Sequence, residues 1–178
     1  MSSPAYGFLY NQNLPSEEEI VAHCLSLGFV RGTPIVDRST QSIIAWIKYG
    51  PNVTTDEART QDWTAKALRD ARVSDLQFPR VFHAFTREYY GCPIGYIAME
   101  FIDGVDCDSN DVELVAKAVQ TLISLKTPPA STLGHVGGGT RSIVHSFPDW
   151  LPNAEYKSNQ DFYTHIKKVS ACQRFAVL

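Results

Sequence analysis

One lysine closes an apolar run early in the chain, and a glutamate follows shortly after it. Lys48 stands near the end of the run from Ser42 to Gly50, which reads Ser-Ile-Ile-Ala-Trp-Ile-Lys-Tyr-Gly. A turn-forming segment, Pro51 to Thr55, separates this run from Glu57. An ammonium group binds phosphate, and a carboxylate on a neighbouring element can hold it in place. The order of strand, lysine, turn and glutamate therefore indicates a phosphate-binding lysine with an acidic partner.

Each of the two residues also has a simpler explanation. A lysine at the end of a strand commonly packs its alkyl stem and leaves its ammonium in water. Glu57 follows Thr54 at capping-box spacing, and a carboxylate suits the positive end of a helix. The sequence leaves open whether Glu57 pairs with Lys48 or only caps its own helix.

Hydrophobic periodicity and capping signals predict helices and strands on both sides of this motif. Ser16 and Glu19 form a capping box at the start of the first helix, and Gly28 stands where a C-terminal cap belongs. The expected helices cover residues 16–27, 55–71, 110–126 and 158–169, with Asn110 capping the third. The expected strands cover residues 33–36, 42–49, 80–89 and 94–102.

The side chains of the strands predict how the sheet is covered. Both faces of the strand that carries Lys48 are apolar, so we expect it to be central and covered on both sides. In the third strand, regular alternation would put Val81, His83 and Phe85 on one face and Phe82 and Ala84 on the other.

Composition excludes several classes of function. The chain has 178 residues and a net charge of -3, without the basic footprint of a nucleic-acid-binding protein. Its apolar runs fall short of the roughly 20 residues that span a bilayer, and its start lacks the features of a signal peptide. The four cysteines are scattered without a metal-binding or redox spacing. We therefore expect a cytoplasmic protein with reduced thiols, no membrane or nucleic-acid partner and no metal ligands of its own.

Four stretches together resemble the aminoglycoside phosphotransferase family, which belongs to the kinase-like group that includes choline kinases. They are Trp46–Gly50, Glu57–Ala58, Phe78–Phe82 and Gly95–Gly104, and the pattern is most similar to fungal members. The resemblance covers roughly residues 16 to 165. It implies an α+β, protein-kinase-like fold: an antiparallel sheet with a helix in an N-terminal lobe, then a partial helical C-terminal lobe. The domains it implies are an arm at 1–15, the N-terminal lobe at 16–102, and the hinge and partial C-terminal lobe at 103–178.

The resemblance also implies roles for single residues. Lys48 would contact the phosphates of ATP and Glu57 would hold it, as strand lysine and helix glutamate do in kinases. The hinge backbone would contact adenine, Met99 would line the pocket, and Mg2+ would enter only as the counter-ion of the nucleotide. The cofactor-binding residues implied in this way are Lys48, Glu57, Met99, Glu100, Phe101 and Ile102.

The chain departs from the family where catalysis takes place. The segment from Pro34 to Gln41 contains no glycine, although the phosphate loop of the family usually does. No His-x-Asp sequence is present, so no residue matches the catalytic aspartate or the magnesium-binding Asn and Asp that would follow it. The chain stops about where that loop is expected, so we expect a truncated product: a pseudoenzyme with elements of an ATP pocket and no catalytic residue.

A second hypothesis concerns the expected helix at residues 110–126. Its apolar stripe consists of Leu114, Val115, Ala118, Val119, Leu122 and Ile123. In a complete kinase-like protein this stripe would pack on the large lobe, so here we expect it to stay exposed or to bind a partner. The alternative function is thus a non-catalytic interaction protein or a homodimer, and a non-functional fragment is a third possibility.

Overall fold

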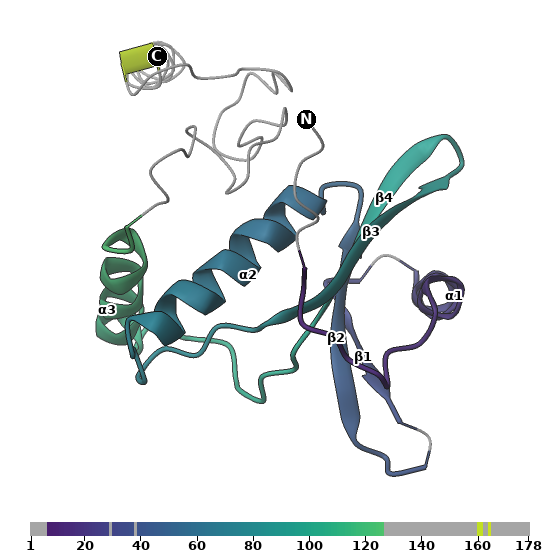
Figure 1. Cartoon of the computed structure of the whole chain (residues 1–178), viewed down its shortest axis with the longest axis horizontal. Coiled ribbons are helices and arrows are strands. Elements are labelled where there is room, and N and C mark those ends of the chain that lie inside the picture. Colours follow the sequence, from purple (N-terminus) through teal and green to yellow (C-terminus); the bar gives the residue numbers. More distant parts are fainter. Residues whose placement is uncertain (1–6, 29, 38, 127–159, 162–163, 165–178) are drawn as a thin grey trace. The chain divides into compact units, whose positions relative to one another are not determined.

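The centre of the molecule is an antiparallel sheet. A computed structural model describes residues 7–28, 30–37, 39–126, 160–161 and 164. The strands are β1 (Thr33–Val36), β2 (Ile43–Gly50), β3 (Val81–Tyr89) and β4 (Cys92–Met99). Their order across the sheet is β1-β2-β4-β3, so β2 is internal, as its apolar faces predicted (Figure 1). The described fold is therefore a mixed α+β arrangement around a four-stranded sheet.

Helix α1 (Glu17–Leu27) covers one face of this sheet. It begins as predicted: Glu19 donates its backbone N–H to Ser16 Oγ, and the Glu19 carboxylate accepts from the Ser16 backbone. Ile20 and Cys24 are buried against alternate residues of the strands. The cluster on this face, called the α1-side cluster, consists of Ile20, Cys24, Ile35, Ala45, Ile47, Tyr49, Phe85, Ile94, Tyr96 and Ala98.

Helix α2 (Thr55–Asp70) covers the opposite face. Thr54 caps it, and Ala58 is fully buried against the sheet. The cluster here, called the α2-side cluster, consists of Val53, Ala58, Val81, Ile97 and Met99, with Phe8, Trp46 and Ala84 packed against it. Lys48 alternates with the buried Ile47 on β2, so it projects on the α2 side with Trp46.

The predicted alternation of β3 is wrong at its start. The register shifts between Val81 and His83, which marks a β-bulge. Val81 and Ala84 therefore lie on the α2 side, whereas Phe82 and Phe85 pack on the α1 side. The extra residue of a bulge shifts the alternation by one position, and hydrophobicity alone does not reveal such a shift.

The chain leaves the sheet earlier than predicted and continues to α3 (Val112–Ile123). β4 ends at Met99, so residues 100–102 lie outside the strand. Asp111, not Asn110, occupies the N-cap of α3, and its carboxylate accepts from the Asp108 backbone instead of capping the helix. The apolar stripe of α3 includes no buried residue, and Leu114 and Ile123 are 67% and 70% exposed.

The chain divides into two compact units, Met1–Lys126 and Thr127–Leu178. The helix expected at 158–169 and most of the proposed C-terminal lobe lie outside the described residues. Among the helices that are described, none combines the length and the hydropathy needed to cross a membrane.

Candidate functional site

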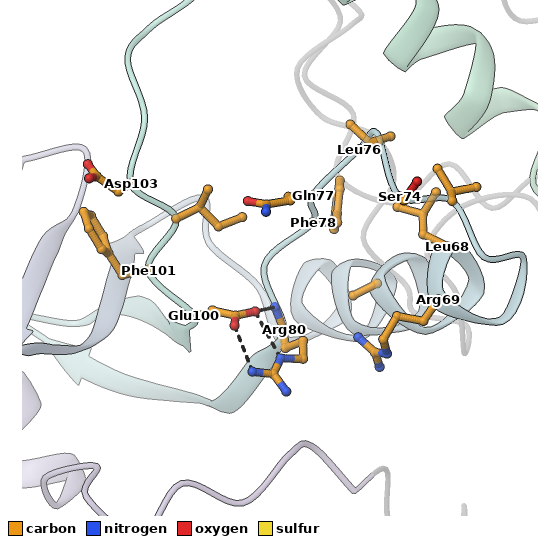
Figure 2. A pocket seen from close by; sticks show the side chains of 13 residues that line it. Leu68, Arg69, Ser74, Leu76, Gln77, Phe78, Arg80, Glu100, Phe101 and Asp103 are labelled. Carbon is orange, nitrogen blue, oxygen red and sulfur yellow. Dashed lines mark hydrogen bonds and ion pairs between the residues drawn. The ribbon is translucent and has the colours of Figure 1, made fainter.

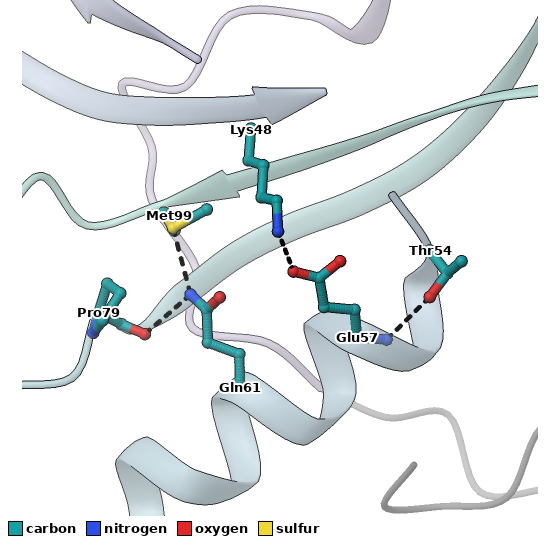
Figure 3. A network of polar contacts seen from close by, with 6 residues as sticks. All are labelled: Lys48, Thr54, Glu57, Gln61, Pro79 and Met99. Carbon is teal, nitrogen blue, oxygen red and sulfur yellow. Dashed lines mark hydrogen bonds and ion pairs between the residues drawn. The ribbon is translucent and has the colours of Figure 1, made fainter. Parts of the chain in front are cut away.

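Lys48 and Glu57 form an ion pair between β2 and the first turn of α2 (Figure 3). The Lys48 Nζ donates to Glu57 Oε1. The side chains are 42% and 31% exposed, so the pair lies at the surface of the α2 side and not within the core. The sequence left two roles open for Glu57, and the structure assigns its carboxylate to Lys48.

The cap of α2 uses a different group of Glu57. Thr54 Oγ1 accepts a hydrogen bond of 3.1 Å from the Glu57 backbone N–H. The backbone of Glu57 is thereby fixed at the helix start while its carboxylate reaches Lys48 (Figure 3). A capped first turn lowers the entropy cost of holding the ion pair, because one partner is already placed.

Two facing glycines allow α2 to begin so close to the end of β2. Gly50 pairs with Gly95 across the β2–β4 ladder, and the Val53 N–H donates back to Gly50 O at 3.2 Å. The turn then lies directly on Gly95, where a Cβ would stand 2.0 Å from Val53 O. A side chain at residue 95 would therefore displace the turn that brings Glu57 to Lys48.

Gln61 links α2 to the end of β4, a contact that the sequence analysis missed. It lies one helical turn beyond Glu57 on the same side of the helix. Its Nε2 is 3.1 Å from Pro79 O and 3.2 Å from Met99 Sδ (Figure 3). The spacing from Glu57 to Gln61 was the available signal, since residues one turn apart share a helix face. Met99 itself is buried.

Arg80 and Glu100 form a second polar link where the chain leaves the sheet (Figure 2). Arg80 donates from Nε to Glu100 Oε2 at 3.0 Å and from Nη2 to Oε1 at 2.8 Å. These hydrogen bonds hold the pKa of the Glu100 carboxyl below its ordinary value. The Glu100 backbone N–H donates to Arg80 O at 2.9 Å. Of the Glu100 backbone groups, only the carbonyl is therefore left to bond with a ligand.

A cavity of about 520 Å³ adjoins the residues that follow β4. Its lining includes Glu100, Phe101 and Ile102 together with Leu68 and Arg69 of α2 (Figure 2). This volume lies in the range of small-molecule sites, roughly 300–1,000 Å³.

The lining of this cavity does not include Lys48, Glu57 or Met99. Along α2, the rise from Glu57 to the lining residue Ala65 is about 12 Å. The structure thus places the six predicted residues in two groups along one side of the sheet. The centroids of the Phe101 and Trp46 rings are 6.0 Å apart. Trp46 and Lys48 both project on the α2 side of the sheet.

The described residues contain no cluster of three or more His, Cys, Asp or Glu side chains that would suit a metal ion. What the site offers is one ammonium held by a carboxylate, an aromatic pair, and the backbone that follows β4. No family model, curated protein or solved structure matches this chain.

Proposed function

We propose that the chain binds an ATP-type nucleotide on the α2 side of the sheet without transferring its phosphoryl group. Lys48 contacts the phosphates, Glu57 positions it, and the hinge after Met99 contacts adenine. The observation that carries this proposal is the ion pair between Lys48 and Glu57. The kinase-like fold is part of the same proposal, supported by the pair and by a sheet in which β2 and β4 are neighbours.

The pair between Lys48 and Glu57 contributes less to folding than a hydrogen bond from Lys48 to a phosphate would contribute to binding. A lysine ammonium has three donors, so a bond to Glu57 leaves others for a ligand. An ion pair this exposed contributes only about 0–1 kcal/mol to folding. A phosphate adds a charge-assisted hydrogen bond worth about 1.5–3 kcal/mol, which is the larger effect.

Phosphoryl transfer is not part of the proposal. The reaction requires an aspartate near the acceptor hydroxyl and side chains that hold magnesium. The sequence contains no His-x-Asp from which these groups would follow. Mg2+ therefore accompanies the nucleotide as a counter-ion, and the expected activity is binding alone.

Calorimetric titration with ATP and Mg2+ tests the proposal. We expect saturable binding that Lys48→Ala weakens about tenfold or more, as the loss of one charge-assisted hydrogen bond implies. Lys117→Ala is the matched control. Lys117 also pairs with a carboxylate, that of Asp75, but it lies on α3 and outside the proposed site. Equal loss in both variants, or no heat from the folded wild-type protein, would overturn the proposal.

The exposed stripe of α3 favours a second candidate, self-association through this helix. Four apolar residues of this stripe are exposed together, and such a group marks an interaction surface: Leu114, Val115, Val119 and Ile123. Sedimentation should then show a mass that rises with concentration and that Ile123→Glu, but not Val105→Glu, abolishes. Val105 is a suitable control, because it is 95% exposed and lies outside α3. A monomer at all concentrations would rule this function out.

A further inference from the structure

The N-terminal arm (residues 7–15) crosses the sheet where the hinge begins. The Leu9 N–H donates to Val81 O at 3.1 Å, at the first residue of β3. The Asn11 Nδ2 donates to Ile44 O at 3.2 Å, near the start of β2. β4 lies between β3 and β2, so the arm passes the end of β4 on its way from one to the other. Figure 1 shows the arm, in purple, running across the sheet before it enters α1.

The spacing agrees with this path. Two neighbouring strand gaps amount to about 9.6 Å. Residues 9 to 11 of an extended chain cover about 7 Å, and the asparagine side chain supplies the rest. The arm therefore crosses the sheet by the shortest route, next to Met99 and the first hinge residue.

Phe8 places an aromatic ring on the α2 side of the sheet, the side to which Lys48 projects. It is half-buried and packs against the α2-side cluster, which includes Met99 and Ile97. Leu14, further along the arm, packs against the α1-side cluster instead. The arm thus wraps around the end of the sheet, with Phe8 on the side that carries Lys48.

Asn11 makes three hydrogen bonds that hold the arm in place. Besides its bond to Ile44, its Oδ1 accepts from the Asn13 N–H at 3.0 Å, and its carbonyl accepts from the Leu14 N–H at 3.2 Å. These contacts form a local turn that leads into the capped start of α1. A segment anchored this close to its binding surface has a high effective concentration there.

We propose that the arm is a built-in competitor of the nucleotide: Phe8 occupies part of the adenine surface beside Met99, and binding requires the arm to move away. This inference rests on the proposed nucleotide site. The apparent affinity equals the intrinsic affinity multiplied by the fraction of molecules in which the arm is open. Releasing the arm therefore tightens binding without any new contact to the ligand.

The test compares ATP·Mg2+ affinities of full-length variants by calorimetry. Phe8→Ala removes the ring, and Asn11→Ala removes the side-chain hydrogen bonds that anchor the arm to Ile44 and Asn13. Tyr10→Ala is the matched control, an aromatic in the same arm that is 85% exposed. We expect Phe8→Ala to bind about five- to tenfold more tightly than wild type, since a half-buried ring gives up roughly half of its burial free energy. Asn11→Ala should also bind more tightly than wild type, because the arm loses its anchor. Tyr10→Ala should bind like wild type.

The outcomes separate the two proposals. Equal affinity in wild type, Phe8→Ala and Asn11→Ala overturns the competing arm but leaves the nucleotide site intact. Tighter binding in Tyr10→Ala as well assigns the effect to general loosening of the arm and also overturns the inference. Absence of binding in every folded variant overturns the nucleotide site and the inference with it. Thermal melts of each variant show that it is folded.

Discussion

Replacing Gly95 by alanine should disrupt the turn that brings Glu57 to Lys48. The new Cβ would stand 2.0 Å from Val53 O and 2.6 Å from Val53 C, both backbone atoms that cannot rotate away. Relief requires movement of the turn or of β4, and overpacking of this kind costs about 1–3 kcal/mol. We expect the upper end, about 3 kcal/mol, because the two shortest contacts are with the backbone of Val53, which cannot move without the turn. That is a large share of a stability of roughly 5–15 kcal/mol.

Urea denaturation measures this cost. With a slope of about 2 kcal/mol per molar, the midpoint of Gly95→Ala should fall by roughly 1.5 M. Gly104→Ala is the control, because nothing lies within 4 Å of a Cβ at that residue. A second readout is ATP affinity, which should weaken together with the Lys48–Glu57 geometry. Equal midpoints for the two alanine variants would refute the packing of the turn on β4.

Three further predictions concern single contacts. Glu100 has a lowered pKa because Arg80 hydrogen-bonds its carboxylate, so it adds stability above its ordinary pKa of 4.5 that disappears as the pH falls through the lowered value. In denaturation series the gap between wild type and Glu100→Gln should be constant near neutral pH and close in acid; a gap independent of pH would contradict the bond. Burial raises the pKa of Cys24 to about 11, so iodoacetamide at pH 8 should modify exposed Cys92 but not Cys24 in the native protein, as peptide mass spectrometry would show. Thr54→Ala should lower the free energy of unfolding by about 1 kcal/mol and weaken nucleotide binding. An unchanged melting temperature would show that Thr54 does not stabilise the start of α2.

Local signals predicted the elements well. The capping box at Ser16, the threonine at residue 54 and the apolar run of β2 each encode their element within a few residues. The order of the residues indicated that Glu57 could pair with Lys48 but left a capping role open; the geometry shows the contact, and its use for nucleotide stays a proposal. Such features depend on neighbours in sequence, which is why pattern reasoning reaches them.

Features that depend on distant segments were missed. The bulge after Val81 follows from how β3 meets β4, and no composition signal marks it. The bond from Gln61 to Met99 and the pairing of Arg80 with Glu100 join residues far apart in sequence. The sequence indicated an arm at 1–15 but not its contacts with Val81 and Ile44, which lie far from it in the sequence.

Hydrogen–deuterium exchange of the full chain, with and without ATP and Mg2+, tests the central claim most directly. A nucleotide that spans the hinge and Lys48 should slow exchange at residues 99–103 and at the start of α2, and leave α1 unchanged. The peptide that contains Leu9 should exchange faster at the same time, because its bond to Val81 opens when the arm is displaced. Protection confined to α1, or no protection at saturating nucleotide, would contradict the account.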